Sequence, residues 1–215
     1  MSRYKAYIFD FDLTLVDSTK PIVACFKHTL KTFGYDIPDD KTIIDTIGLP
    51  LTDAFDILSG ITPNPNKAEM RKTYVAYADG VMARESVFYP DALGILQSLV
   101  TAERKVAIVS SKMRYRIVET FEHHTAYMPV DLIVGLDDVK TAKPDPAGLL
   151  FAIDKLGVSK EDVLYIGDSY IDAETAQNAG VDFAGVATGS TSKERLKEYP
   201  NVTVGDSLTE VFLNI

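Results

Sequence analysis

Residues 4–18 read YKAYIFDFDLTLVDS: a short apolar run, residues 6–9, is followed at once by Asp10 and Asp12. Such a run is typical of a buried strand, and both aspartates come at its carboxyl end. Open α/β sheets bind their ligands at the carboxyl ends of the strands. We therefore expect this stretch to carry the functional site and the rest of the chain to complete it.

Composition narrows the class of protein. The chain has 215 residues, of which 46% are hydrophobic and 25% charged, as in a soluble globular protein with a full core. It shows no apolar run long enough to span a membrane and no signal peptide, and its single cysteine suits a reducing compartment, so we expect a cytoplasmic protein. The net charge of −9 disfavours nucleic acid and anionic membranes as partners. An anionic substrate would need a local positive charge, from a metal or from lysines.

Hydrophobic periodicity divides the chain into two kinds of structure. Between residues 18 and 85 it predicts only helices, at 20–33, 39–46, 51–58 and 66–83. We take Ser18 as the N-cap of the first of these helices. From residue 87 onward, short β-rich runs alternate with helices. The predicted strands are 106–109, 132–134, 163–166, 183–186 and 202–204, and the predicted helices are 91–102, 113–122, 146–156, 171–179, 192–197 and 207–213.

This alternation indicates parallel βαβ units. The predicted fold class is α/β, with a three-layer Rossmann-like parallel sheet as its core and an inserted all-helical cap domain. We expect residues 1–16 and 87–215 to form the core and residues 17–86 to form the cap.

Four polar stretches follow predicted strands. They are Asp10-Phe11-Asp12, Ser110-Ser111-Lys112, Lys143-Pro144-Asp145-Pro146, and the run from Gly167 through Asp168 to Asp172. Each has an ordinary interpretation when taken alone: the acids and serines would cap helices, and the lysine would lie on the surface. Together they favour a single site, because a parallel sheet brings the carboxyl ends of its strands to one edge.

Several carboxylates at one edge would repel one another unless a cation lay among them. A hard divalent ion with oxygen ligands, Mg²⁺ by preference, meets that requirement. The metal and Lys143 would then make a positive pocket for a phosphate in an otherwise acidic protein. The four stretches therefore predict a magnesium-dependent phosphate site.

The order of these motifs resembles that of the haloacid dehalogenase superfamily of phosphohydrolases. The resemblance covers the whole chain, and the run GDSYIDAETAQNAG at 167–180 is its most specific part. A helical insertion directly after the first motif resembles the small cap of the phosphoglycolate phosphatase-like branch. Residues 47–51, IGLPL, resemble the cap loop that leans over the active site in that branch. Residues 135–139, ahead of Lys143, also resemble the corresponding segment of this branch.

The resemblance implies a role for each matching residue. Asp10 would be the nucleophile, and Asp12 the general acid and then the base. Asp10, Asp168, Asp172 and the backbone carbonyl of Asp12 would bind the metal. The groups expected to bind the phosphate or the substrate are Ser110, Lys143, the backbone N–H groups near Phe11, Asp12 and Ser111, and the loop at Gly48.

Two positions depart from the family pattern. Leu13 stands where many relatives have glycine, so the turn there must keep a negative φ or tolerate modest strain. Asp91 also stands where relatives often carry glycine, and we expect it to stiffen the return from the cap to the core.

The leading interpretation is a Mg²⁺-dependent phosphatase that hydrolyses a small phosphomonoester, phosphoglycolate-like, through an aspartyl-phosphate. Alternatives are an inorganic pyrophosphatase or nucleotidase of the same branch, or a sugar phosphomutase. A binding protein without turnover is disfavoured because Asp10, Asp12, Lys143 and Asp168 are all intact. The expected partner is a small phosphorylated metabolite; both a monomer and a homodimer stay open. Cap residues facing the cleft would set specificity, with Lys20, Lys41, Arg71, Lys72 and Arg84 as candidates, although charges on a cap helix more often form a solvated face.

Overall fold

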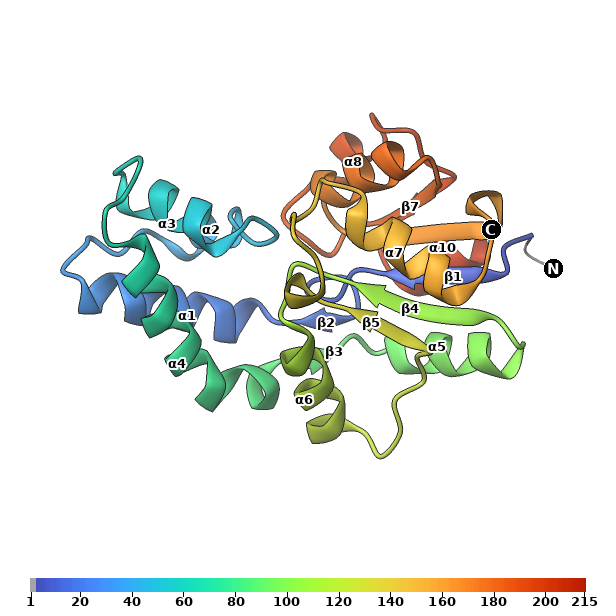
Figure 1. Ribbon diagram of the computed structural model, residues 1–215, viewed down its shortest axis with the longest axis horizontal. Helices are drawn as coiled ribbons and strands as arrows, with labels where there is room; N and C mark the ends of the chain where they lie inside the picture. Colours follow the sequence, from blue (N-terminus) through green and yellow to red (C-terminus); the bar gives the residue numbers. More distant parts are fainter. Residues whose placement is uncertain (1–2) are drawn as a thin grey trace.

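The computed structural model describes residues 3–215, so residues 1 and 2 of the predicted core segment lie outside it. Two parts are visible in Figure 1, a sheet with flanking helices and a separate group of helices. The sheet has six strands in the order β5-β4-β1-β6-β7-β8, and every neighbouring pair is parallel. Their bounds are β1 Ala6–Phe9, β4 Lys105–Val109, β5 Leu132–Val134, β6 Val163–Gly167, β7 Asp182–Val186 and β8 Thr203–Gly205. The predicted α/β fold class is confirmed.

Strand β1 occupies a central place in the sheet, and all four of its residues are buried. Its last residue, Phe9, lies opposite Ile108 of β4 and Ile166 of β6. The segments that leave these three strands therefore start side by side. This register is what brings polar residues from distant parts of the sequence to one edge.

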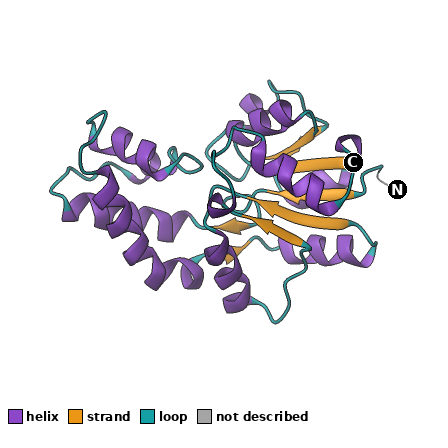
Figure 2. Ribbon diagram, viewed as in Figure 1, coloured by secondary structure: helices purple, strands orange, loops and turns teal. Residues whose placement is uncertain are grey.

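Helices cover both faces of the sheet and complete the three layers (Figure 2). On one face lie α5 (Ala92–Thr101), α6 (Arg114–His124) and α10 (Leu208–Leu213); on the other lie α7 (Ala147–Leu156), α8 (Tyr170–Ala179) and α9 (Lys193–Leu196). Two short 3₁₀ helices, η1 (Leu136–Asp138) and η2 (Lys160–Asp162), occur in the connections.

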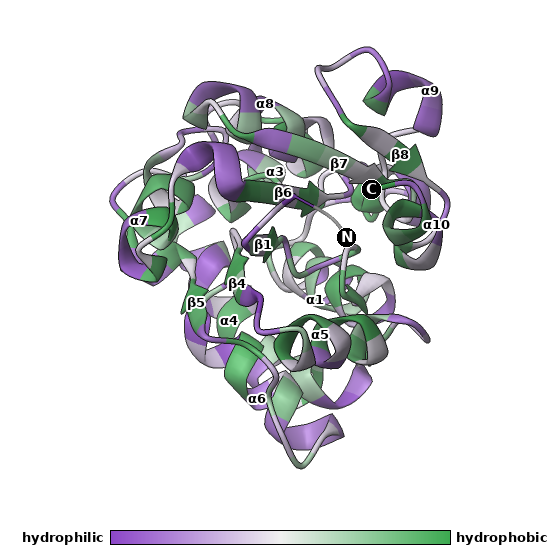
Figure 3. Ribbon diagram, turned by 90° about the vertical axis from the view of Figure 1, so that its right-hand side faces the viewer, coloured by the Kyte–Doolittle hydropathy of each residue, from purple (hydrophilic) through white to green (hydrophobic). Residues whose placement is uncertain are grey.

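Alternate residues of β1 point into two separate apolar clusters. Tyr7 and Phe9 belong to the first cluster and Ala6 and Ile8 to the second. A strand that is apolar on both faces is what a sheet covered by helices on both sides requires. In Figure 3 the central strands are coloured as hydrophobic, and the outer faces of the surrounding helices carry the hydrophilic colour.

The inserted helices are α1 (Thr19–Thr32), α2 (Asp40–Ile44), α3 (Leu51–Ser59) and α4 (Lys67–Glu85). They enclose an apolar cluster of their own, in which the rings of Phe26, Phe55 and Tyr74 pack against one another. All four predicted helices are present within a few residues of their expected ends. Ser18 precedes α1 as predicted, but its hydroxyl caps no backbone N–H and is buried without a hydrogen-bond partner within residues 3–215.

A short antiparallel pair joins the two parts of the molecule. Strand β2 (Val16–Asp17) leads out of the sheet part, β3 (Val87–Phe88) leads back, and the two are paired. The sequence analysis missed both because two residues are too few for a periodic pattern. The pairing places the two connecting segments side by side.

Asp91 lies just after this crossing, directly before α5. Its carboxylate accepts hydrogen bonds from the backbone N–H and the hydroxyl of Thr209. It therefore fastens the start of α5 to α10 on the same face of the sheet.

No helix within residues 3–215 is both long and apolar enough to cross a membrane.

Candidate active site

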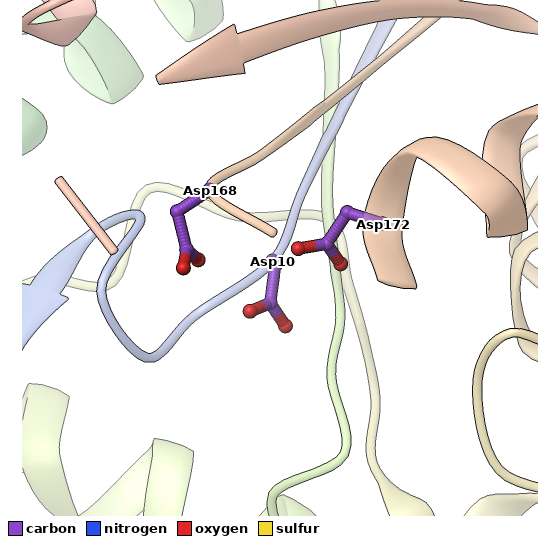
Figure 4. Close-up of side chains that lie close together, drawn as sticks. All are labelled: Asp10, Asp168 and Asp172. Carbon is purple, nitrogen blue, oxygen red and sulfur yellow. The ribbon is translucent and has the colours of Figure 1, made fainter. Parts of the chain in front are cut away.

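Three carboxylates meet at the carboxyl edge of the sheet (Figure 4). Asp10 directly follows β1, Asp168 directly follows β6, and Asp172 lies in the first turn of α8. One oxygen from each can be chosen so that all three lie within 4.8 Å of one another, and all three residues are buried. The structure thus brings together three of the residues predicted as metal ligands.

Lys143 bridges two of these acids. Its Nζ donates to Asp10 Oδ1 at 2.8 Å and to Asp172 Oδ1 at 2.6 Å, and its side chain is only 7% exposed. Burial disfavours the charge on Lys143, but the two carboxylates outweigh that effect and raise the pKa of this lysine well above its ordinary value. Lys143 is therefore a permanently charged group in contact with the predicted nucleophile.

Asp172 is held by donors on both of its oxygens. Oδ1 also accepts from the Tyr165 hydroxyl at 3.0 Å, and Oδ2 accepts from the hydroxyl and the backbone N–H of Ser169. The Ser169 hydroxyl accepts in turn from the backbone N–H of Asp172, which makes a capping box at the start of α8. Asp172, predicted as a metal ligand, therefore also takes part in capping α8, whose N-cap residue is Ser169.

The cluster carries more negative charge than one lysine balances. Burial, followed by the neighbouring carboxylates, raises the pKa of Asp10 to about 6 despite the opposing effect of Lys143. The same two causes raise the pKa of Asp168 well above its ordinary value. A divalent cation would stabilise the charged form of both acids and so offset these increases in pKa. Three buried carboxylates are the hard oxygen ligands that such a cation prefers. The donor set therefore fits a divalent metal.

Asp168 is positioned by two residues that the sequence analysis did not single out. Thr14 Oγ1 donates to Asp168 Oδ1 at 2.8 Å. Gly189, in the segment after β7, passes so close that a Cβ built on it would lie 1.8 Å from Asp168 Oδ2. Glycine is required here by close approach, and no local pattern around residue 189 reveals this.

We expect Gly189→Ala to displace the Asp168 carboxylate and to lower kcat about 10- to 100-fold, because misplacing a site residue by about 1 Å costs rate on that order. Steady-state phosphate release measures the effect. Gly157→Ala is the matched control for a changed glycine: a Cβ there meets no atom within 4 Å, although its positive φ will cost some stability. If Gly189→Ala kept full activity, the close approach to Asp168 would have no functional weight.

Asp12 lies apart from the three-acid cluster. Its Oδ1 accepts from Lys112 Nζ at 2.6 Å, and the lysine side chain is only 6% exposed. Asp12 and Lys112 line the same cavity as Asp10. In the sequence Lys112 stands only beside a serine motif, and no local pattern indicates its pairing with Asp12, 100 positions earlier.

The turn after Asp12 adopts the strained alternative considered from the sequence. Leu13 has φ of 61°, a left-handed conformation that costs a non-glycine residue roughly 1–2 kcal/mol. Its backbone N–H donates to Val16 O at 2.7 Å, and its side chain is buried. Burial of the leucine side chain contributes free energy that offsets this strain.

A cavity of about 200 Å³ lies between the sheet edge and the inserted helices. Ser110, Ser111 and Lys143 line it from the core, together with Asp10, Asp12, Lys112, Asp168 and Ser169. From the helical insert it is lined by residues 46–52, which include Gly48, and by Ile22, Phe26, Arg71, Tyr74, Val75 and Met82. The predicted phosphate-binding residues and the predicted cap loop therefore face one space.

Two of the predicted contacts take a restricted form. The ring of Phe11 is fully buried against Phe88 and Phe121, so only its backbone can serve the site, as expected. Of the five charged cap candidates, Arg71 alone lines the cavity. The other four form ion pairs within the insert, Lys20 and Arg84 with Glu85, Lys41 with Asp45 and Lys72 with Glu69.

The raised pKa of Asp10 predicts a pH-dependent stability of the metal-free protein. A raised pKa means that the folded state holds this proton more tightly than the unfolded state does. The contribution is present below the ordinary value of 3.8 and is lost as the pH rises through about 6. Between pH 4 and 6 the melting temperature of the EDTA-treated native protein should fall relative to that of Asp10→Asn. Above pH 6 the two melting temperatures should change in parallel. Mg²⁺ at pH 7.5 should raise the melting temperature of the native protein more than that of the variant; equal gains would contradict the assignment.

Comparison with known proteins places the chain in one family. The family model described as haloacid dehalogenase-like hydrolase matches residues 7–186. A protein named pyrophosphatase PpaX from Listeria welshimeri is 32% identical and covers 89% of this chain and 87% of its own length; one from Bacillus velezensis is 31% identical, with 92% and 89% covered.

Solved structures show the same fold over the full length. One from Bacteroides fragilis, described as haloacid dehalogenase-like, has a TM-score of 0.93 and 41% identity, and the match covers 96% of this chain and 99% of that one. Another from Lactobacillus plantarum, described as a phosphoglycolate phosphatase, has a TM-score of 0.85 at 24% identity with 99% of both chains covered, and at that identity it supports the fold alone. The chain belongs to the haloacid dehalogenase-like hydrolases.

Proposed function

We propose that this protein is a Mg²⁺-dependent phosphatase that hydrolyses a small organic phosphomonoester through an aspartyl-phosphate on Asp10. The observation that carries the proposal is the contact of Asp10 with Lys143 in the wall of a cavity that the inserted helices cover. Two further buried carboxylates lie beside Asp10. A carboxylate nucleophile needs no base to activate it, and the lysine is placed to neutralise a phosphoryl group bound against it.

The chemistry would proceed in two displacements at phosphorus. An Asp10 oxygen forms a bond to phosphorus while the bond to the leaving oxygen breaks, and Asp12 gives its proton to that oxygen. Asp12 then takes a proton from water, whose oxygen attacks phosphorus and releases Asp10 and inorganic phosphate. Lys112, through its 2.6 Å contact, keeps the Asp12 carboxylate at the cavity wall for both transfers.

The remaining site residues would bind and orient the phosphoryl group. The Ser110 hydroxyl, the Lys143 ammonium group and the backbone N–H groups of Phe11, Asp12 and Ser111 would donate to its oxygens. Asp10, Asp168, Asp172 and the backbone carbonyl of Asp12 would hold Mg²⁺, which supplies positive charge to the phosphoryl oxygens as they gain charge in the transition state.

Residues 17–86 would act as a cap that excludes water from this reaction. The cap contributes about half of the residues that line the cavity, and its two connections to the core run side by side as β2 and β3. Paired linkers of this kind suit a hinge on which the cap opens for exchange of substrate and product. We infer that the core comprises residues 1–16 and 87–215.

Inorganic pyrophosphatase activity is the second candidate, because the curated relatives from Listeria welshimeri and Bacillus velezensis carry that name. The cap wall of the cavity argues for an organic substrate instead. Ile22, Phe26, Leu49 and Met82 line it, and pyrophosphate offers no apolar surface to such side chains.

Phosphate release from a panel of phosphomonoesters and pyrophosphate, each with Mg²⁺ or with EDTA, tests the proposal. We expect turnover of at least one organic ester, abolished by EDTA and restored by Mg²⁺. Pyrophosphate as the best substrate would favour the second candidate. Transfer of the phosphoryl group to a sugar without release of phosphate would indicate a mutase, and no turnover of any compound would overturn the proposed function.

A further inference from the structure

Arg116 lies where the core meets the inserted helices. It belongs to α6, yet its Nη2 donates to the Val75 carbonyl at 2.9 Å and to Asp79 Oδ1 at 2.5 Å, both on α4. The residue is only 5% exposed. Both contacts are made by Nη2, so neither satisfies the other terminal nitrogen of the guanidinium.

That other nitrogen, Nη1, is buried and has no hydrogen-bond partner among residues 3–215. Arginine is always charged and can only donate, so a buried guanidinium N–H without an acceptor is costly and uncommon in native structures. Arg116 also lines the cavity that contains Asp10. Nη1 itself is fully buried, so a molecule bound in the cavity would supply the missing acceptor once the guanidinium or the cap shifts.

The surroundings indicate what kind of group this acceptor would be. The two buried lysines of the cavity already form ion pairs, Lys143 with Asp10 and Lys112 with Asp12. Apolar side chains make up much of the remaining wall, among them Phe26, Met82 and Met113. A charged donor in such a wall interacts more strongly with an anionic oxygen than it would in water.

We propose that Arg116 is a specificity-determining residue that binds a second anionic oxygen, of a carboxylate or a further phosphate, on the leaving-group part of the substrate. This rests on the proposed function: with the reacting phosphoryl group bound against Asp10 and Lys143, a group at Arg116 must belong to the leaving alcohol. The same residue touches the cap, so an anion bound there would also sit against the closed position of α4.

Matched substrate pairs test this without any mutation. 3-(Phosphonooxy)propanoate is compared with its amide, and 1,3-propanediol bisphosphate with 1,3-propanediol monophosphate. We expect the native enzyme to favour the anionic member of at least one pair by about 10- to 100-fold in kcat/KM, mainly through KM, as a charge-assisted hydrogen bond would produce. The pair that shows the preference distinguishes a carboxylate from a phosphate.

Variants then assign the preference to Arg116. In Arg116→Met the kcat/KM values for the anionic and neutral members should become equal within about threefold. Arg116→Lys should retain part of the preference. Asp79→Asn is the control: it removes the negative charge on α4 beside Arg116 and leaves Nη1 in place, so the preference should persist. Thermal unfolding shows whether each variant is folded.

The outcomes separate this inference from the proposed function. Turnover of both members at equal kcat/KM by the native enzyme would overturn the role of Arg116 and leave the phosphatase standing. A preference that survives in Arg116→Met would also overturn it. No phosphate release from any of the four compounds or from the wider panel would overturn the proposed function itself.

Discussion

Asp10→Asn is expected to lower kcat by about 10⁴-fold or more, because it removes the atom that bonds to phosphorus. The two side chains have nearly the same shape, and the asparagine oxygen can still accept the hydrogen bond that Lys143 now gives to Asp10 Oδ1. The loss would therefore report on nucleophilicity rather than on packing. Phosphate release with the best substrate of the panel, at saturating Mg²⁺, measures it.

Covalent trapping makes the same prediction more specific. Rapid acid quenching of the native enzyme with a ³²P-labelled phosphomonoester should leave label on the protein, and hydroxylamine should release it, as it does from acyl phosphates. Asp10→Asn should carry no label. Asp91→Asn is a matched control, since its carboxylate binds Thr209 and does not line the catalytic cavity, and it should keep kcat within about twofold. Label retained by Asp10→Asn would place the nucleophile elsewhere.

The part of this site that could be predicted from the sequence is the part encoded by contiguous residues. The apolar run before Asp10 indicated a buried strand, and the run before Asp168 indicated another; parallel register then brings the two acids together. Lys143 could be added because a family motif marks it. The overall α/β arrangement followed from alternation of strand and helix patterns, which depends only on local periodicity.

The rest of the site depends on contacts that no local pattern encodes. Lys112 meets Asp12 only after β1 and β4 have paired, and Gly189 approaches Asp168 from a loop without a motif. Arg116 is set on the buried face of an amphipathic helix, where an arginine alone gives no sign of its partner. Such residues become recognisable only when an ion pair, a close approach or a missing hydrogen-bond partner is seen in three dimensions.

The strain at Leu13 depends partly on local sequence and partly on tertiary contacts. The sequence showed that a glycine-like turn was in question, and the structure shows the left-handed φ together with a buried leucine side chain. A rule based on φ alone would have favoured glycine, but such a rule leaves out the apolar contacts that the leucine makes. Local conformation and packing oppose each other here, and packing prevails.

Lys143→Met should have two separable effects, on catalysis and on stability. Loss of the charge beside the phosphoryl group should lower kcat by about 10³-fold, as removal of one strong electrostatic donor does. The metal-free variant should also lose about 3–5 kcal/mol of unfolding free energy, the usual cost of leaving one side of a buried ion pair uncompensated. Asp10 and Asp172 would then face each other with no cation between them.

Urea denaturation in EDTA at pH 7.5 and pH 5 measures the second effect. The loss should be smaller at pH 5, because the pKa of Asp10 is about 6 even with Lys143 present, and without the lysine that acid would be protonated at still higher pH. Lys112→Met is the matched control: an equally buried lysine that compensates a single carboxylate, on the more exposed Asp12, and it should lose less stability. The contradicting result is a loss of stability in Lys143→Met that is no larger than in Lys112→Met and is the same at both pH values. In that case the three acids would not interact with one another as proposed, and the argument for a divalent cation among them would fail.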